Sequence, residues 1–527
     1  MMVGICGGGI ANIRLADGTI VSIDNYSTSP AASTPTLYTP AVVPTPPRAD
    51  PGYLATVDDA SSTGLLAVGV PGTLKAWCHI LENYGTLPLA TVMAPAIRHA
   101  ANGFGASEYL ATIIKNSANL INRFPATAAV FMPAGAPPSP GDAIVQSDLA
   151  TSYRIIAEDG PDALYGGVLG EKLANYMAAE GGLITLEDLK NYAIAERYVG
   201  PVANCPTLGT YRGFQIVGCT PCSAGGVHLV EMLNILEHFD VAGFGFGTKE
   251  GLHLLAEVMK LGFEDRNAYT GDPAFLDVPV ELLVSKEYAA KRAAHVMMDT
   301  VRAFRSEGPA ESDESANTTN LAVADADGNV VEMTQTINGL FGCGAMVPGT
   351  GILLNNTQNM FDPHPGMPHS VAPGKRVTSS MAPTIVLYPD GSPFFAVGLP
   401  GGIRIFTSVL QAVINVIDHK MTPQQAVEAP RMWTQGAEVL LERTFPDNVF
   451  GELKTMGHSV GDKVPTIGGG MSMVMFSEPG KPKSMTGACC WRADGTPMGM
   501  AGGYALSGAR FSTGNLDDKK EEPWPKL

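Results

Sequence analysis

The sequence has few cysteines, few basic residues and no long hydrophobic run. Eight cysteines in 527 residues are too few for a disulfide scaffold, so we expect reduced thiols with structural roles. No stretch reaches the ~18 apolar residues of a membrane-spanning helix. Lys and Arg number 34 against 51 Asp and Glu, and the net charge of -17 argues against nucleic-acid and anionic-membrane partners. The remaining composition, 45% hydrophobic and 16% charged, is that of a globular protein with ample core.

The start of the chain also lacks the features of a signal peptide. Its first residues, Met1-Met2-Val3-Gly4-Ile5-Cys6, contain neither a basic region nor a long apolar one. The compartment therefore stays open. The chain as given is consistent with a cytoplasmic protein, and a periplasmic protein is the alternative if the natural chain begins earlier.

The predicted type of secondary structure changes near residue 318. Helical periodicity dominates the first part, and short apolar strands with turns dominate the second. The polar segment 306–317 between them reads as an exposed linker. The pattern predicts an α+β fold in which helices cover sheets. The predicted helices are 71–122, broken at Gly85 and Gly103, two within 146–180 that are split by 165–167, one from 185, and 223–239, 249–267, 408–419 and 423–429. The predicted strands are 10–15, 19–24, 210–218, 320–325, 329–337, 351–355, 383–388, 394–398, 471–476 and 485–490. The predicted loops are 25–52 and 125–140.

Thr318 stands where the polar linker meets an apolar strand. An internal threonine lacks a positioned base, but an N-terminal threonine carries an α-amine with a pKa of about 7.7–8 beside its own hydroxyl. Cleavage between Asn317 and Thr318 would therefore create a nucleophile and its base in one residue. Thr336 ends a strand that is expected to run antiparallel to the one after Thr318, where it could hydrogen-bond the nucleophile.

Two later strings offer the other groups that an amidase needs. Gly401 and Gly402 follow a predicted strand, and bare backbone can bring two N–H groups to an oxyanion. Ser379 and Ser380 offer hydroxyls for a polar group of an acyl chain. Each motif alone is also typical of an ordinary strand entrance, turn or loop. Their order and spacing favour the catalytic interpretation.

Cysteine and histidine suggest little further chemistry. Cys219 and Cys222 have the spacing of a redox or metal-binding pair, but no second such pair accompanies them, so a structural role is expected. His228, His253 and His419 fall on predicted helices and read as core or surface residues. The hydrolysis expected here requires no metal and no organic cofactor.

Longer strings around these residues are shared with one family. Through these strings the chain resembles the γ-glutamyltranspeptidase family of N-terminal-nucleophile hydrolases. The resemblance covers nearly the whole chain and is most specific over 318–404. The strings are Thr334-Gln335-Thr336-Ile337-Asn338-Gly339, Gly351-Ile352-Leu353-Leu354-Asn355-Asn356, Pro373-Gly374-Lys375-Arg376, Ser379-Ser380-Met381-Ala382-Pro383-Thr384, Gly401-Gly402-Ile403-Arg404-Ile405, Leu164-Tyr165-Gly166-Gly167 and Phe263-Glu264-Asp265-Arg266. Within the family, Asp362-Pro363-His364-Pro365-Gly366 and Cys490-Trp491-Arg492-Ala493-Asp494 look most like the transpeptidase-like bacterial cephalosporin (glutaryl-7-aminocephalosporanic acid) acylases.

The resemblance implies a four-layer αββα sandwich and self-cleavage of one precursor into two subunits. The large (α) subunit would be 1–317 and the small (β) subunit 318–527. The residues that the family pattern assigns are Thr318 as nucleophile, Thr336 as its hydrogen-bonding helper, Asn338, Ser379 and Ser380 as contacts to the acyl chain, and Gly401 and Gly402 as the oxyanion hole.

Two departures from the family pattern bear on the substrate. Transpeptidases hold the glutamyl carboxylate with an arginine in the loop after the second strand, yet 24–38 contains no Arg or Lys. They hold the glutamyl ammonium with an acidic residue just before a phenylalanine, and Met360 takes that place before Phe361. A buried charge without its partner is costly. The predicted substrate is therefore a small-molecule amide with a plain, glutaryl-like acyl group.

Two alternatives stay open. The chain could be an authentic γ-glutamyltransferase or glutathione hydrolase. It could also be a catalytically inert family member, because it starts inside the glycine-rich strand that other members reach only after further residues.

Overall fold

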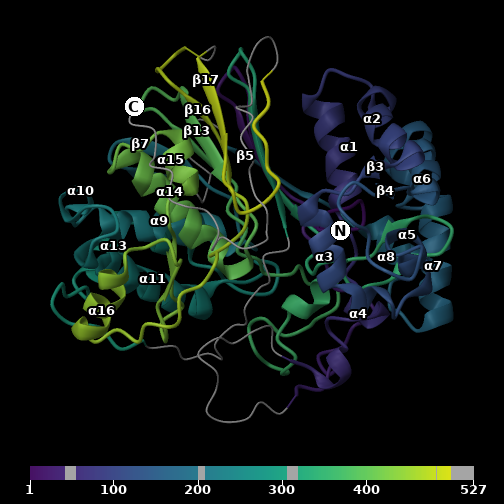
Figure 1. Cartoon of the computed structure of the whole chain (residues 1–527), viewed down its shortest axis with the longest axis horizontal. Coiled ribbons are helices and arrows are strands. Elements are labelled where there is room, and N and C mark those ends of the chain that lie inside the picture. The colour runs from purple at the N-terminus through teal and green to yellow at the C-terminus, as the bar shows by residue number, and fades with distance from the viewer. Residues whose placement is uncertain (42–54, 200–207, 305–317, 482–483, 500–527) are drawn as a thin grey trace.

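Two antiparallel sheets stacked face to face form the centre of the molecule. The computed structural model describes residues 1–41, 55–199, 208–304, 318–481 and 484–499. Helices cover the outer side of each sheet, so that four layers follow one another from left to right in Figure 1. The predicted αββα sandwich of an N-terminal-nucleophile hydrolase is confirmed.

Each sheet combines strands that are distant in sequence. The first sheet has the order β5-β2-β1-β9-β8, and the second has the order β17-β16-β13-β12-β7-β6. Every pairing in them is antiparallel. The strands are β1 (Gly8–Arg14), β2 (Ile20–Asp24), β5 (Ala195–Val199), β8 (Thr319–Ala324), β9 (Val330–Thr336), β6 (Leu208–Tyr211), β7 (Phe214–Val217), β12 (Thr384–Leu387), β13 (Pro393–Gly398), β16 (Ser472–Phe476) and β17 (Met485–Cys489). Each sheet thus joins segments from both sides of the predicted cleavage point.

The two sheets meet through an apolar layer. Alternate residues of a strand point to opposite faces, and the inward set here is aliphatic or aromatic. Such a layer excludes water and holds the sheets in one relative position, because sliding them would expose apolar surface. Its buried members are Ile20, Val217, Val330, Ile385, Leu387, Ala396, Val474 and Phe476.

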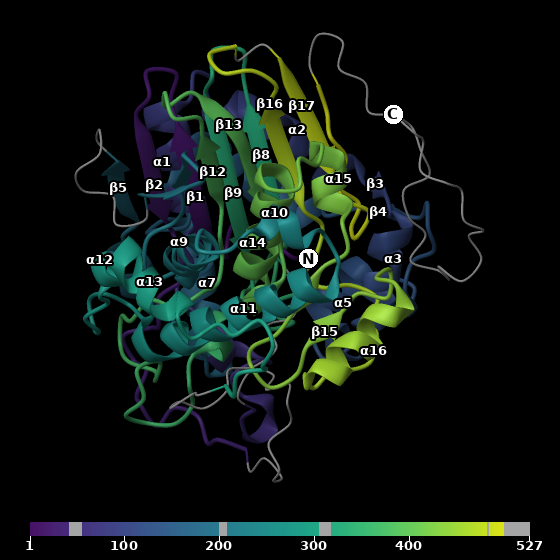
Figure 2. The same cartoon turned by 90° about the vertical axis from the view of Figure 1, so that its left-hand side faces the viewer.

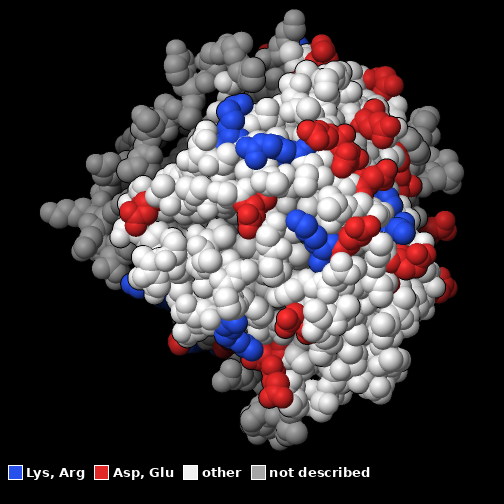
Figure 3. All heavy atoms as spheres, turned by 90° about the vertical axis from the view of Figure 1, so that its right-hand side faces the viewer, with Lys and Arg blue, Asp and Glu red and all other residues white. Residues whose placement is uncertain are grey.

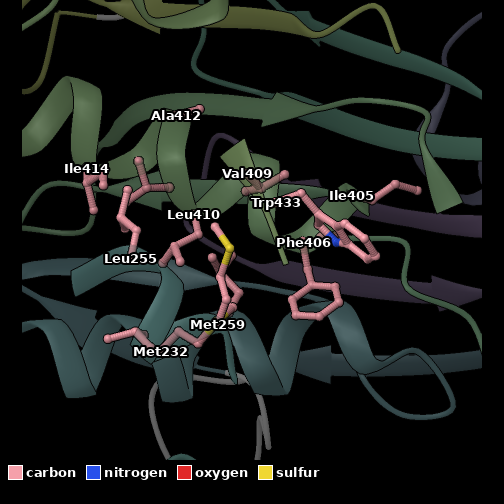
Figure 4. Close-up of a cluster of buried hydrophobic side chains, with 14 of the residues drawn as sticks. Met232, Leu255, Met259, Ile405, Phe406, Val409, Leu410, Ala412, Ile414 and Trp433 are labelled. Carbon is pink, nitrogen blue, oxygen red and sulfur yellow. The ribbon is translucent and has the colours of Figure 1, made fainter. Parts of the chain in front are cut away.

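Three long helices cover the second sheet. They are α9 (Ala224–Leu236), α11 (Lys249–Tyr269) and α14 (Ile405–Ile417), and they lie together in Figures 1 and 2. Figure 4 shows side chains of the three helices lying together, among them Met232 of α9, Met259 of α11 and Leu410 of α14. Shorter helices complete this side: α10 (Val241–Phe244), α12 (Val280–Leu283), α13 (Lys286–Ala293), α15 (Pro423–Glu428) and α16 (Asp447–Met456).

The other helical layer comes entirely from the first part of the chain. Helix α1 (Thr73–Tyr84) packs on the first sheet, where Ala76 contacts a cluster that includes Ile13 and Ile23. The outer face of this layer carries scattered charges of both signs, with acidic groups more frequent (Figure 3). Its further helices are α2 (Leu89–Asn102), α3 (Glu108–Asn116), α4 (Ala118–Ile121), α5 (Pro125–Phe131), α6 (Ser147–Asp159), α7 (Val168–Glu180) and α8 (Leu186–Asn191). Among the described helices, none combines the length and apolar character needed to span a membrane.

Most predicted elements are confirmed, with two corrections. The predicted loop 125–140 contains helix α5, which begins at Pro125 because proline is tolerated in the first turn of a helix. The predicted strand 351–355 is only two residues long, Ile352–Leu353 (β11). Thr185 caps α8 in a capping box with Asp188, as its sequence predicted. The linker 306–317 lies outside the described residues, and so does Asn317.

The first strand approaches the end of β9 too closely for a side chain. Gly8 pairs with Thr336, and a Cβ atom on the preceding Gly7 would lie 2.1 Å from the Thr336 carbonyl oxygen. Neither backbone can move away, because Thr336 is held in the sheet by its pairing with Gly8, and the Gly7 carbonyl accepts hydrogen bonds from the Gly72 and Thr73 amides.

Substituting Gly7→Ala should therefore destabilise the protein by about 1–3 kcal/mol, the range found for overpacked cores. Thermal or urea unfolding measures the change. Gly451→Ala is the matched control: Gly451 lies inside α16, and a Cβ atom there would have no neighbour within 4 Å, so alanine should be neutral or slightly stabilising. Equal stability of the Gly7→Ala variant and the unmodified protein would contradict the close approach.

Candidate active site

Thr318 and Thr336 face each other at the mouth of two adjacent strands. Thr318 directly precedes β8, and Thr319 pairs with Gln335 in the antiparallel ladder. The Thr318 and Thr336 Oγ1 atoms are 3.4 Å apart, and the two residues are 7% and 1% exposed. This separation is longer than an ideal hydroxyl bond, as is common for catalytic contacts without substrate. The antiparallel placement predicted for Thr336 is confirmed.

Asn338 closes the turn after β9. Its backbone N–H donates to Thr336 Oγ1 at 2.8 Å, which helps to orient that hydroxyl. Its φ angle is +73°, a left-handed conformation that asparagine tolerates better than most residues. Its side-chain Nδ2 donates to the Asn356 carbonyl at 3.0 Å. The turn beside the threonines is therefore tied to the segment that leads to Met360.

Gly401 and Gly402 lie just beyond the end of β13. Gly398, the last residue of β13, approaches Asn320 of β8 so closely that a Cβ atom there would lie 2.3 Å from Asn320 Nδ2. Gly401 and Gly402 have φ angles of +152° and +59°, where glycine is favoured. A Cβ atom on Gly401 would also lie 2.8 Å from the Gly468 Cα.

The amides of this glycine pair are poised to receive an anion. Neither the Gly401 N–H nor the Gly402 N–H donates to an acceptor in the described part of the chain. Gly401 is the N-cap and Gly402 the first residue of a short 3-10 helix (Gly402–Arg404) that runs directly into α14. The first amides of a helix are unpaired and its N-terminal end carries partial positive charge. Two free N–H groups at such an end suit the negative oxygen of a tetrahedral intermediate.

Ser379 and Ser380 are buried just before β12, at 2% and 0% exposure. Ser379 forms a parallel bridge with Ser223, the N-cap of α9. Ser380 Oγ accepts a hydrogen bond from Arg266 Nη2 of α11 at 3.0 Å. Both serines are thus held by the helices that cover the second sheet.

Met360 ends the short 3-10 helix Thr357–Met360. The Tyr26 hydroxyl, from the segment after β2, lies 3.2 Å from the Met360 sulfur. Asn359, the residue before it, donates to Ser61 Oγ at 3.2 Å. The transpeptidase pattern has a carboxylate at this position. In this chain the position is filled by the Met360 thioether, which contacts the phenol of Tyr26.

Sequence reasoning assigned no role to Arg266, Ser223 or Tyr26. One available signal was helical periodicity: Met259, Phe263 and Arg266 fall on one face of α11, and an arginine on an otherwise apolar face is unusual. Arg266 is only 1% exposed. The contacts of Ser223 and Tyr26 come from strands and loops that are far apart in the sequence, so no local pattern could indicate them.

The cysteine pair is structural in its contacts, as expected. Cys219 donates its thiol to the Met381 carbonyl at 3.0 Å, and Cys222 donates to Asp24 at 3.5 Å. Burial raises the pKa of the Cys219 thiol to about 12, so a reactive thiolate is not available there. Both cysteines are free thiols.

One group of side chains in the described residues has the composition of a metal site. His253, Glu257 and His458 are buried with ligand atoms within 4.8 Å of one another. Lys260 Nζ lies 2.8 Å from Glu257 Oε1 and already balances that carboxylate. His253 bonds His458 at 2.8 Å through Nδ1, so the polar groups satisfy each other. A second cation beside the ammonium would be repelled.

A buried acidic pair links α9 and α11 behind the serines. Desolvation raises the pKa of Glu231 to about 7, and desolvation together with the Glu231 charge raises the pKa of Asp265 to about 8. His228 lies 2.6 Å from Glu231, and burial lowers the pKa of His228 to about 3, so its ring is neutral. Arg292 Nε lies 2.9 Å from Asp265, and the Tyr288 hydroxyl lies 3.0 Å from it. The folded protein therefore holds at least one proton on the acidic pair near neutral pH.

Stability should consequently fall as pH rises. The folded-state pKa of both carboxyls is raised, so their contribution is complete below the unfolded values near 4 and is lost as pH passes about 7 to 8. Urea unfolding at pH 5, 6.5 and 8 measures this slope. Glu231→Gln should flatten it, because a neutral amide needs no proton and no longer opposes ionisation of Asp265. Glu171→Gln, which alters an exposed carboxylate on α7, should leave the slope unchanged. An unaltered slope in the Glu231→Gln variant would contradict this account.

Comparison with known sequences identifies relatives over almost the whole chain. The family model described as Gamma-glutamyltranspeptidase matches residues 1–500. The chain is 49% identical over 512 residues to the Acylase ACY 1 proenzyme of Pseudomonas sp. (strain SE83), covering 97% of this chain and 88% of that protein. It is 37% identical over 469 residues to the Glutathione hydrolase proenzyme of Escherichia coli (strain K12), covering 86% and 78%.

Solved structures agree with the sequence comparison. The cephalosporin acylase from Bacillus halodurans superposes with a TM-score of 0.80 at 28% identity, over 94% of this chain and 87% of that one. The γ-glutamyltranspeptidase of Helicobacter pylori gives a TM-score of 0.51 at 33% identity, over 57% of this chain and 81% of that one.

Proposed function

This chain belongs to the gamma-glutamyltranspeptidase family, and from that premise we propose that it is a self-processing N-terminal-threonine acylase. It hydrolyses the amide of a small molecule with a glutaryl-like acyl group. One observation carries the proposal: Thr318 is buried at the start of β8, and its Oγ1 lies 3.4 Å from that of Thr336. The unpaired amides of Gly401 and Gly402, which follow β13, are the proposed oxyanion hole. The acylase proenzyme of Pseudomonas and the cephalosporin acylase of Bacillus support the reaction class.

Maturation uses the future nucleophile on its own peptide bond. The Thr318 hydroxyl attacks the carbonyl carbon of Asn317, and the C–N bond breaks as the acyl group passes from nitrogen to oxygen. Water then hydrolyses the resulting ester, which frees the Asn317 carboxylate, the Thr318 hydroxyl and the Thr318 amine. The products are a large chain, 1–317, and a small chain, 318–527. Each sheet contains strands of both chains, joined by the β1–β9 pairing in the first sheet and the β12–β7 pairing in the second, so the halves stay associated after the cut.

Hydrolysis of substrate repeats the same chemistry on an external amide. Thr318 Oγ1 attacks the amide carbonyl while its own α-amine takes the proton. The Gly401 and Gly402 amides stabilise the oxyanion, and the loss of one such donor typically costs about 10²–10³ in rate. The protonated amine gives its proton to the leaving nitrogen, and water, activated by the same amine, releases the acyl group. Thr336 orients the nucleophile, while Asn338, Ser379 and Ser380 bind the acyl chain.

The surroundings of Met360 favour an acyl group without an ammonium. The thioether contacts the Tyr26 hydroxyl. Asp24, the only acidic residue in 24–38, lies 3.6 Å from the Arg376 guanidinium. A glutamyl ammonium placed at Met360 would lose its hydration without gaining a counter-charge. A glutaryl group has the same length and lacks that amine.

Thr318→Ala should abolish both cleavage and activity, because it removes the attacking oxygen. A denaturing gel should show one species near 55.2 kDa in place of two smaller ones. Thr318→Ser keeps a hydroxyl and should still mature. N-terminal sequencing of the smaller fragment should begin at Thr318 in the unmodified protein. A single uncut species in the unmodified protein would instead favour the inert alternative.

Met360→Asp should shift acyl preference toward γ-glutamyl groups by about tenfold or more, because it supplies the missing counter-charge. The measurement compares kcat/KM for γ-glutamyl p-nitroanilide and glutaryl p-nitroanilide. The unmodified protein should prefer the glutaryl substrate. Met360→Leu, which restores no charge, is the matched control and should keep that preference.

The second candidate function, a glutathione hydrolase, is favoured by the 37% identity to the Escherichia coli proenzyme. A tenfold preference of the unmodified protein for the γ-glutamyl anilide would select it and overturn the argument from Met360.

A further inference from the structure

The two serines before β12 use their protons differently. Ser223 Oγ lies 2.7 Å from the Met381 carbonyl, which can only accept, so the Ser223 proton points there. Ser379 Oγ lies 3.1 Å from Ser223 Oγ. Since the Ser223 proton is already engaged, Ser379 must be the donor in that contact. The proton of Ser379 is therefore committed within the protein.

The proton of Ser380 is not committed. Its hydroxyl oxygen lies 3.0 Å from Arg266 Nη2, and a guanidinium has donors only. Ser380 must therefore accept from Arg266, and its own proton points elsewhere. No acceptor in the described part of the chain lies within hydrogen-bond distance of that proton, although Ser380 is fully buried. A buried hydroxyl that keeps a free donor is costly unless something else accepts from it.

We propose that Arg266 is a positioning residue that makes Ser380 an obligate hydrogen-bond donor, so that the site selects acyl groups with a terminal carboxylate or carbonyl oxygen. This inference rests on the proposed function and narrows its substrate class. Arg266 acts through Ser380 and does not itself touch the reacting atoms.

Charge works in the same direction as the hydrogen bond. Arg266 is 1% exposed, so its positive charge is screened little by solvent. The field of the guanidinium polarises the Ser380 O–H bond and strengthens its donation to an anion. An acyl group that ends in a carboxylate gains from both effects. One that ends in a methyl group leaves the Ser380 donor unsatisfied.

The test compares two substrates that differ only at the far end of the acyl chain. Glutaryl p-nitroanilide and pentanoyl p-nitroanilide carry five acyl carbons each, ending in a carboxylate and a methyl group. The unmodified enzyme should prefer the glutaryl substrate. Arg266→Met removes all donors from that side chain and should lower the preference about tenfold or more, the size expected for a hydrogen bond to a charged group.

The loss should appear in KM for the glutaryl substrate, with kcat for the pentanoyl substrate changed by less than about threefold, because uniform binding is what is removed. Arg266→Lys keeps a side chain with donors only and should retain more of the preference than Arg266→Met. Ser380→Ala should lose the preference as well. The double variant Arg266→Met/Ser380→Ala should be no less selective than Ser380→Ala alone, because Arg266 acts through that hydroxyl.

Arg14→Gln controls for the loss of any buried arginine. Arg14 is 7% exposed, bonds three backbone carbonyls, and lies at the far end of β1 from the Gly8–Thr336 pair. It should keep the glutaryl preference of the unmodified enzyme. Full preference retained in Arg266→Met, or effects of Arg266→Met and Ser380→Ala that simply add, would overturn the inference.

Failure of this inference is distinguishable from failure of the proposed function. If the unmodified protein neither matures nor releases glutarate, the acylase proposal itself is wrong. If it does both and Arg266→Met is unchanged, only the role of Arg266 is wrong. If Arg266→Met does not mature, the comparison of Ser380→Thr with Ser380→Ala takes its place. Ser380→Thr keeps the hydroxyl and should retain the preference for the glutaryl substrate, whereas Ser380→Ala should lose it. Equal preference in the two variants would overturn the inference.

Discussion

This fold depends on glycine residues that let backbone segments approach one another closely near the start of β8 and the end of β9. Gly7 presses on the Thr336 carbonyl from one side, Gly398 meets Asn320 from the facing sheet, and Gly401 meets Gly468 in the loop beyond. A methyl group at any of these contacts would overlap its neighbour. Because no side chain fits at these contacts, backbone segments of both sheets lie close together near Thr336 and Asn320. That arrangement is built from strands on both sides of Thr318, so it exists before any cut is made.

Buried charge forms a second layer of organisation behind these glycine contacts. Helices α9 and α11 carry Glu231, Asp265 and Arg266 with almost no exposure, in a layer otherwise filled by Leu, Met and Phe. Charges in such surroundings persist only where partners compensate them. The partners here come from the opposite helix, from α13 and from the serine segment. The same residues that cost desolvation free energy thereby fix the helices relative to the segment before β12 that carries Ser379 and Ser380.

The departures from the transpeptidase pattern acquire a physical meaning in this setting. Met360 beside the Tyr26 hydroxyl makes a weakly polar surface where a carboxylate would require a cation. An acid at Met360 would bind an ammonium and a basic residue in 24–38 would bind a carboxylate, so the two departures remove partners of two different groups of a glutamyl substrate. Selectivity for an acyl group without an ammonium then results from the missing charges at Met360 and in 24–38 as much as from the contacts that are present.

Particular residues show where sequence reasoning succeeded and where it could not. The pairing of Thr318 with Thr336 followed from strand period and a single turn, both of which are local. The helix at 125–131 was missed because prolines dominate that segment, and proline in a first turn looks the same as proline in a loop. The direction of the Ser380 hydroxyl depended on Arg266, which lies 114 residues earlier in the chain. No spacing rule connects two residues that meet only because two layers stack.

Hydrophobic period and short motifs, being local, were enough to indicate the fold class, the order of elements and the candidate nucleophile. Which glycines face backbone, which amides stay unpaired and which serine keeps its proton became known only from the folded chain. These properties arise where separate layers come into contact, and hydrogen-bond geometry at such contacts depends on small displacements that no local pattern carries.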